Sequence, residues 1–171
     1  MKTLILGGVR SGKSRHAEEL ASAAGGAVTV IATARALDEE MVRRIETHRL
    51  HRPAHWAVIE EPLALGAALR AADGAGRVLV VDCLTLWLTQ LLDLPDEELS
   101  AQTTALLDTL ATLRAEVILI GNETGLGIMP LGELTRRYGD LAGRLHQDLA
   151  RRADRVILMV AGLPLLLKGS A

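Results

Sequence analysis

The sequence contains no phenylalanine, one tyrosine and two tryptophans, so a buried core must be built from leucine, valine, isoleucine and alanine. The shortage of aromatic rings argues against proteins that bind single-stranded nucleic acid by stacking bases on such rings. An excess of positive charge is also lacking, because 19 basic residues stand against 21 acidic ones, for a formal net charge of −2. We therefore expect no nucleic-acid partner and no attraction to anionic lipid.

Cysteine and long apolar runs are scarce as well. The single cysteine, Cys83, cannot form an internal disulfide and fits a reducing compartment. The first apolar run, Leu4 to Leu6, ends at Gly7, and this beginning does not resemble a signal peptide. No apolar stretch approaches the ~20 residues needed to span a bilayer. The sequence thus predicts a cytoplasmic protein without a membrane span.

Apolar residues are nevertheless abundant, at 49% of 171 residues, which suits one domain with a sizeable core. Short β-branched runs alternate with longer helical patterns. The runs predict buried strands at 3–6, 28–32, 77–81, 116–120 and 156–160, with a weaker strand at 57–60. Helical spacing predicts helices at 13–24, 38–50, 62–72, 85–92, 96–114 and 131–153. This order predicts a single α/β domain over residues 1–171, with a mostly parallel sheet and helices on both faces.

One glycine-rich segment, GGVRSGKS at 7–14, matches the phosphate-loop pattern G-x-x-x-x-G-K-[ST] in full, between a predicted strand and a predicted helix. Its glycines let backbone N–H groups turn toward phosphate oxygens at the positive end of the helix. Lys13 would reach the β- and γ-phosphates, and the Ser14 hydroxyl would ligate Mg²⁺. The predicted nucleotide-binding residues here are Gly7, Gly8, Val9, Arg10, Ser11, Gly12, Lys13 and Ser14.

A second acid of the kind that accompanies a phosphate loop follows a buried run at 78–81. This position places Asp82 at the carboxyl edge of the sheet, where ligands bind in open α/β folds. Asp82 is predicted to hold Mg²⁺ or its water shell. A second interpretation, compatible with the first, makes Asp82 the N-cap of the helix that follows.

The phosphate loop alone leaves an ATPase, a GTPase switch and a small-molecule kinase open. The late strand ends in GNETG at 121–125, without the Asn-Lys-x-Asp pattern that reads guanine in GTPase switches, so a switch is disfavoured. A nucleic-acid motor would need a longer and more basic chain. A kinase and a nucleotide-binding regulatory module without chemistry both remain.

Three histidines, His48, His51 and His55, lie within eight residues. A zinc site is disfavoured, because no cysteine lies nearby in the sequence and no H-E-x-x-H motif occurs. At about 100° per residue, His48 falls on the inward stripe of the predicted 38–50 helix. Spacing alone leaves two interpretations open, a packed core histidine and a nucleophile that attacks phosphorus.

The motifs together cover essentially the whole chain. They are GGVRSGKSRHAE at 7–18, IATA at 31–34, DEEM at 38–41, RIxxHR at 44–49, RPxxW at 52–56, EEP at 60–62, VDCLT at 81–85 with WL at 87–88, GNETGxGIxP at 121–130 and RYxDxAGR at 137–144. This set resembles the bifunctional adenosylcobinamide kinase / adenosylcobinamide-phosphate guanylyltransferase family of cobalamin biosynthesis. One departure is His146, where the family usually has asparagine; we expect it to lie away from the phosphate loop.

The resemblance implies two reactions that use Mg²⁺ as cofactor and ATP and GTP as substrates. A kinase phosphorylates the aminopropanol hydroxyl of adenosylcobinamide, and a guanylyltransferase then moves GMP from GTP onto that phosphate, giving adenosyl-GDP-cobinamide and pyrophosphate. The family forms a GMP–histidine intermediate, which falls on His48 here, with Lys13 as the second catalytic residue and His51 as the fallback nucleophile. The alternative is a phosphate-loop small-molecule kinase only, with a structural His48.

The resemblance also implies where the ligands bind and how the subunits assemble. Nucleotide contacts fall on Ala32, Thr33, Ala34, Arg49, Leu50, His51, Arg52 and Glu60, beside the phosphate loop and Asp82. The loop at 125–130 and the region 134–138 are candidate contacts for the corrinoid substrate. A homotrimer is implied, and the apolar stripe of the 131–153 helix is a candidate interface.

Overall fold

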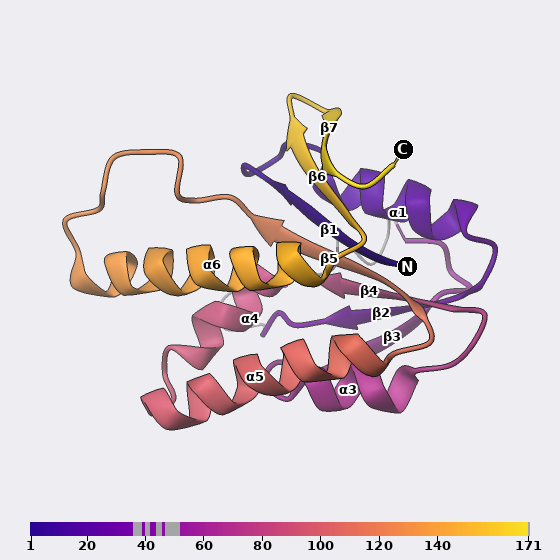
Figure 1. The fold of residues 1–171 in the computed structure, drawn as a ribbon, viewed down its shortest axis with the longest axis horizontal. Helices are drawn as coiled ribbons and strands as arrows, with labels where there is room; N and C mark the ends of the chain where they lie inside the picture. Colours follow the sequence, from indigo (N-terminus) through magenta and orange to yellow (C-terminus); the bar gives the residue numbers. More distant parts are fainter. Residues whose placement is uncertain (36–38, 40–41, 44–45, 47–51, 171) are drawn as a thin grey trace.

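The computed structural model describes residues 1–35, 39, 42–43, 46 and 52–170 (Figure 1). The strands are β1 Lys2–Gly7, β2 Ala27–Ala32, β3 Ala57–Glu60, β4 Arg77–Asp82, β5 Glu116–Asn122, β6 Arg155–Val160 and β7 Leu163–Lys168. The helices are α1 Lys13–Ala23, α3 Leu65–Ala72, α4 Leu84–Leu91, α5 Asp96–Thr112 and α6 Glu133–Arg152. Most of the predicted 38–50 helix lies outside the described residues.

The strands form one seven-stranded sheet in the order β3-β2-β4-β5-β1-β6-β7. Every neighbouring pair is parallel except β6 and β7, which are antiparallel. This arrangement confirms the predicted α/β class with a mostly parallel sheet. The central strands carry apolar residues on both faces, as expected for parallel strands covered by helices on either side.

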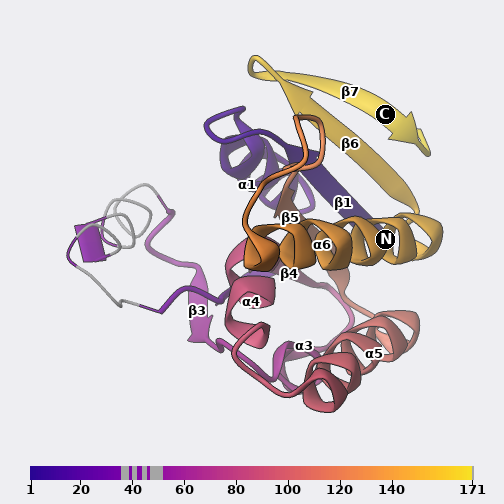
Figure 2. The ribbon, with the colours of Figure 1, turned by 90° about the vertical axis from the view of Figure 1, so that its left-hand side faces the viewer.

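Helices cover both faces of the sheet and enclose two apolar cores. Figure 2 shows α1 on one side and α4, α5 and α6 on the other. On β1, Leu4 and Leu6 point into the core beneath α3 to α6, whereas Ile5 points into the core beneath α1. Trp87 is fully buried in the larger core and donates its indole N–H to the Leu63 carbonyl at 2.8 Å. None of the helices that the structure describes combines the length and apolar character needed to cross a membrane.

Two features differ from the sequence prediction. Strand β7 was not predicted. Its LPLLLK segment contains Pro164, which cannot donate to a ladder, and this proline is tolerated because β7 is an edge strand. Helix α3 begins at Leu65 rather than at the predicted residue 62. The Glu61 carboxylate explains the delay, since it accepts the N–H groups of Leu63 and Ala64 at 2.9 and 2.8 Å and holds those residues in a turn.

The backbones of α3 and α5 approach closely at Gly66. A Cβ at this position would lie 2.9 Å from the carbonyl oxygen of Ala105 and 3.1 Å from the nitrogen of Leu106, both of which are backbone atoms that cannot rotate away. We expect Gly66→Ala to lower the free energy of unfolding by about 1–3 kcal/mol because the two helices must separate. Urea unfolding followed by circular dichroism measures the change.

Gly143→Ala is the matched control, because Gly143 is an exposed helical glycine of α6 whose added Cβ would meet no atom within 4 Å. There the alanine should stabilise the protein by up to about 1 kcal/mol through helix propensity. Equal shifts of the two variants in the same direction would contradict the close-approach argument.

Candidate active site

The parallel strands bring the predicted site residues to one edge of the sheet. Ala32 is in register with both Glu60 and Asp82, and Gly7 is in register with Asn122. In spatial order the carboxyl edge therefore carries Glu60, Ala32, Asp82, Asn122 and Gly7. Ligands of open α/β sheets bind outside this edge.

The phosphate loop runs from β1 into α1 and needs glycine for its shape. Gly7 and Gly12 have φ angles of +153° and +96°. A Cβ on Gly7 would lie 2.6 Å from both the Ser11 hydroxyl oxygen and the Met159 carbonyl oxygen. The turn between β6 and β7 braces the loop, since the Gly162 N–H donates to the Ser11 carbonyl at 3.1 Å. This hydrogen bond thus supports the wound conformation of the loop.

Lys13 folds back across its own loop. Its ammonium donates to the Gly8 carbonyl at 2.6 Å and lies 3.5 Å from the Ser11 hydroxyl, and the residue is only 7% exposed. Burial lowers the pKa of Lys13 below its usual range, while the negative charge of Asp82 opposes this shift. Lys13 and Asp82 are therefore close enough for their charges to interact, and a bound phosphate would offer the ammonium a charged acceptor in place of the carbonyl.

Asp82 is held by Arg52, a pairing that the sequence did not predict. The Arg52 guanidinium donates to the Asp82 carboxylate at 2.7 Å, and the two side chains are 10% and 17% exposed. The interpretation of Asp82 as a helix N-cap is wrong, because the cap residue of α4 is Cys83 and no side chain caps the helix. The Asp82 carboxylate thus pairs with the Arg52 guanidinium at the edge of the sheet.

Thr33 uses its polar groups to join two strand ends. Its buried hydroxyl accepts the Cys83 N–H at 3.0 Å and donates to the Cys83 carbonyl at 2.7 Å. Its own N–H donates to the Asp82 carbonyl, and its carbonyl accepts the Gln90 side-chain amide. The side chain therefore points into the protein and fixes the path of the chain between Ala32 and Ala34.

The remaining predicted residues are placed as follows. Glu60 is exposed at the end of β3. Four predicted residues lie outside the described residues: His48, Arg49, Leu50 and His51. Of the three histidines considered for a zinc site, the structure therefore describes only His55. In the ranges that the structure does describe, no group of three or more His, Cys, Asp or Glu side chains could hold a metal ion.

The residues predicted to hold Mg²⁺ suit that ion chemically. Ser14 stands in the first turn of α1 and Asp82 at the end of β4, and both offer hard oxygen ligands. Asp82 ends the strand that pairs with β5, and β5 pairs on its other side with β1, which leads into the phosphate loop. Mg²⁺ in nucleotide sites needs only one or two protein ligands, because phosphate oxygens and water complete its shell.

Glu123 and His146 lie closer to the loop than the sequence suggested. The Glu123 N–H donates to the Gly7 carbonyl at 3.0 Å. Its carboxylate lies 4.0 Å from Nδ1 of His146, a residue that we expected to lie away from the phosphate loop. An acid just after a buried strand was the signal that identified Asp82, and the same signal was present at Glu123.

Comparison with known proteins connects this site to a family. The model for cobinamide kinase / cobinamide phosphate guanyltransferase matches residues 3–167. The chain is 60% identical to the bifunctional adenosylcobalamin biosynthesis protein CobP of Pseudomonas aeruginosa, over 99% of this chain and 98% of that protein. It is 38% identical to the bifunctional protein CobU of Escherichia coli, over 98% of this chain and the whole relative.

Solved structures are alike in fold alone. A RadB recombinase superposes with a TM-score of 0.54 at 17% identity, over 92% of this chain and 73% of that one. A protein of Pyrococcus horikoshii OT3 superposes with a TM-score of 0.58 at 7% identity, over 99% of this chain and 87% of that one.

The ion pair between Arg52 and Asp82 should contribute to stability. Arg52→Met leaves the largely buried carboxylate without this partner, and we expect the free energy of unfolding to fall by about 1–3 kcal/mol in the absence of ligand. Arg114→Met is the control, because Arg114 is 73% exposed and 3.9 Å from Asp73, so its loss should cost below about 0.5 kcal/mol. Urea unfolding at pH 7 measures the free energy of unfolding of both variants. Equal decreases in the two variants would contradict a stabilising role of the Arg52–Asp82 ion pair.

Proposed function

The chain belongs to the cobinamide kinase / cobinamide phosphate guanyltransferase family, and we propose that residues 1–171 form one catalytic domain that performs both reactions at the carboxyl edge. The first reaction phosphorylates adenosylcobinamide. The second transfers GMP from GTP to the resulting phosphate, giving adenosyl-GDP-cobinamide and pyrophosphate. The observation that carries this proposal is a complete phosphate loop beside Asp82 in a chain that matches the family over residues 3–167.

The triphosphate would lie on the phosphate loop. Backbone N–H groups at the start of α1 and the Lys13 ammonium bind its oxygens, and Ser14 and Asp82 would hold Mg²⁺. Mg²⁺, when bound, neutralises charge on the phosphates. Lys13 only has to turn from the Gly8 carbonyl toward the phosphate, a short movement for a residue that is already desolvated.

Arg52 would exchange its partner when nucleotide binds. Its guanidinium donates a hydrogen bond to the Asp82 carboxylate in this structure. A planar guanidinium also suits phosphate oxygens, which supports the nucleotide contact that the sequence resemblance gives to Arg52. Transfer of Arg52 from Asp82 to a phosphate would keep the cation paired and would make the carboxylate available to hold Mg²⁺.

Glu60 is proposed to select guanine. Its carboxylate stands exposed on the edge strand β3 and can accept hydrogen bonds from the N1–H and the 2-amino group of the base. Strands β2, β4 and β5 separate β3 from β1, so a nucleotide bound at the phosphate loop must extend along the edge for its base to reach Glu60. Ala32 and Ala34, which have small side chains, flank that path.

His48 is proposed as the nucleophile of guanylyl transfer. A neutral imidazole nitrogen attacks the α-phosphorus, the new N–P bond forms, and the bond to the bridging oxygen breaks so that pyrophosphate leaves with the electron pair. The substrate phosphate then attacks the same phosphorus and displaces the histidine. The support for His48 is its spacing in the RIxxHR motif.

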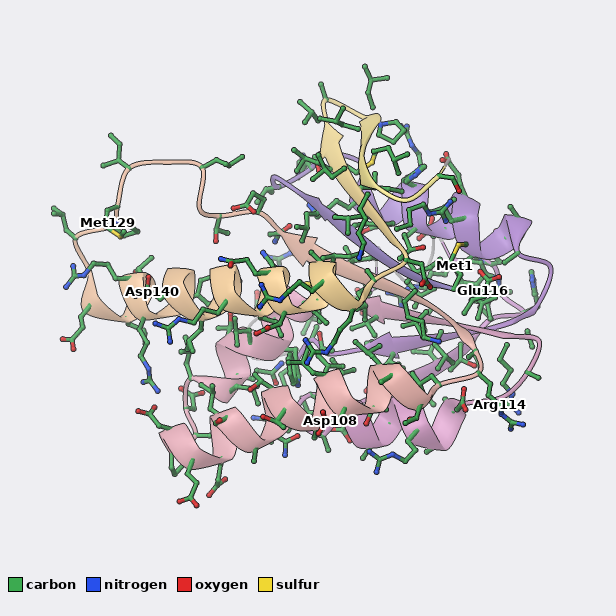
Figure 3. All side chains as sticks on the ribbon, in the orientation of Figure 1. Met1, Asp108, Arg114, Glu116, Met129 and Asp140 are labelled. Carbon is green, nitrogen blue, oxygen red and sulfur yellow. The ribbon has the colours of Figure 1, made fainter. Side chains whose placement is uncertain are left out.

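The segment after β5 is proposed to bind the corrinoid. Five large apolar side chains are exposed there within nine residues: Leu126 at 84%, Ile128 at 98%, Met129 at 66%, Leu131 at 97% and Leu134 at 62%. Figure 3 shows Met129 at the outer end of this segment, beyond the start of α6. Apolar side chains gathered in this way mark a binding surface. A corrin ring is a large, partly apolar ligand that suits them.

The proposal extends to location and assembly. A cytoplasmic location is supported by the single cysteine, Cys83, which cannot form an internal disulfide. A homotrimer is proposed from the family resemblance.

Covalent labelling tests the proposed nucleophile. We expect incubation with Mg²⁺ and α-³²P-GTP to give a labelled protein on denaturing gels, with a label that is stable to base and lost in acid, as for a phosphoramidate. His48→Ala should abolish the label, because His48 is the side chain proposed to form the covalent bond to the α-phosphorus. His55→Ala is the control and should keep the label.

The other outcomes identify the alternatives. A label that survives His48→Ala would move the nucleophile to His51 or His55. Absence of label in the wild type would favour the plain kinase with a structural His48. Turnover of GTP with a corrinoid acceptor excludes the regulatory module.

Substitution in the apolar segment tests the corrinoid surface. We expect Ile128→Ser to raise the KM for adenosylcobinamide about tenfold, because burial of an isoleucine side chain against a ligand is worth about 1.5 kcal/mol. The KM for the nucleotide should stay within about twofold. Leu167→Ser, at an exposed leucine of β7, is the matched control. An unchanged corrinoid KM in Ile128→Ser would contradict this surface.

A further inference from the structure

Glu123 occupies a place on the carboxyl edge to which no role has been given. Strand β5 lies between β1, which leads into the phosphate loop, and β4, which ends in Asp82. Glu123 follows β5 directly, and its N–H donates to the Gly7 carbonyl at 3.0 Å. The carboxylate of Glu123 thus comes from the strand that separates the loop from the proposed magnesium ligand.

The Glu123 side chain is held in place and remains accessible. One carboxylate oxygen, Oε1, accepts the Gly125 N–H at 2.6 Å, and the other, Oε2, faces Nδ1 of His146 at 4.0 Å. The side chain is 23% exposed. A carboxylate that is held in this way and is partly exposed can meet a substrate without a large loss of side-chain entropy.

His146 is the side chain that faces the Glu123 carboxylate in the part of the chain that the structure describes. It is 11% exposed, and burial lowers the pKa of its imidazole, while the negative charge of Glu123 opposes this shift. Gly121 makes room for this ring, since a Cβ there would lie 3.0 Å from Nε2 of His146. Burial also raises the pKa of Tyr138, which keeps its phenol neutral.

The acceptor substrate would approach Glu123 from the proposed corrinoid surface. Glu123 begins the segment whose side chains Leu126, Ile128 and Met129 are exposed. A corrinoid bound on that segment would present its side-chain hydroxyl between the segment and the phosphate loop. Glu123 stands at this junction.

We infer that Glu123 is the general base of the kinase reaction. Its carboxylate accepts the proton of the acceptor hydroxyl while that oxygen forms a bond to the γ-phosphorus. The bond from the γ-phosphorus to the β,γ-bridging oxygen breaks, the nucleoside diphosphate leaves with the electron pair, and the proton passes from Glu123 to water. In the guanylyl transfer the acceptor is a phosphate, which is already an anion, so that step has no need of this base. The inference rests on the proposed function and adds the residue that activates its first acceptor.

Separate assays of the two reactions test the inference. Glu123→Gln keeps the size of the side chain and an acceptor for the Gly125 N–H but cannot take up the proton. We expect its kinase kcat with ATP and adenosylcobinamide to fall about 10²–10³-fold, with the KM for ATP within about threefold. Transfer of GMP to preformed adenosylcobinamide phosphate should stay within about threefold. Glu116→Gln is the control, because Glu116 stands at the opposite end of β5, and both its activities should be unchanged (Figure 3).

Each other outcome overturns a definite claim. A folded Glu123→Gln variant that keeps its kinase rate within threefold, or that loses both reactions equally, overturns the role of Glu123. If circular dichroism shows that this variant is unfolded, Glu123→Asp provides the test. Its carboxylate is retracted by one methylene, so the kinase rate should fall at least about tenfold while guanylyl transfer is spared. An unchanged kinase rate in Glu123→Asp overturns the inference. Wild-type protein without kinase turnover overturns the kinase half of the proposed function as well, whereas a failure confined to the variants leaves that function intact.

Discussion

The parallel register of the sheet is the constraint on which the whole site depends. Because β1, β5, β4, β2 and β3 run in one direction, their carboxyl ends meet at one edge, and residues distant in sequence become neighbours there. The hydrogen bond from the Glu123 N–H to the Gly7 carbonyl is the clearest case. A shift of β5 by one residue would break this bond and turn buried side chains such as Leu119 out of their core. Burial of the strands on both faces therefore fixes the geometry of the edge as well as the stability of the sheet.

Charged groups at this edge already have partners inside the protein. Lys13 donates to the Gly8 carbonyl, and Arg52 pairs with Asp82. An unpaired charge at these buried positions would be costly, so each cation needs a partner when the nucleotide is absent. In the proposed complex, each cation would exchange a protein oxygen for a phosphate oxygen. Such an exchange would favour ligands that bring enough negative charge to replace both internal partners at once, as a triphosphate does.

Local patterns in the sequence were sufficient to predict most of the fold and part of the site. The phosphate loop and the buried run before Asp82 are contiguous segments, and their spacing is dictated by backbone geometry that any chain must obey. The pairing of Arg52 with Asp82 could not be predicted, because it joins residues from different elements whose approach depends on the tertiary fold. Strand β7 was missed for a different reason. Pro164 is a local signal against a strand, whereas the edge position that tolerates it is a property of the whole sheet. Glu61 likewise delays α3 through side-chain hydrogen bonds that helix periodicity does not contain.

The proposed site serves two acceptors that differ in one chemical respect. A hydroxyl must lose a proton to become a good nucleophile, whereas a phosphate is already charged at neutral pH. Both reactions need the same stabilisation of a triphosphate, which the phosphate loop and Lys13 can supply whichever phosphorus is attacked. The groups that differ must therefore lie outside the loop, one serving the γ-phosphorus and one the α-phosphorus. Glu123, just after the strand beside the loop, is proposed to serve the hydroxyl, and His48 is proposed to serve the α-phosphorus. This proposed division of roles would let one nucleotide site support two transfers without a second phosphate loop.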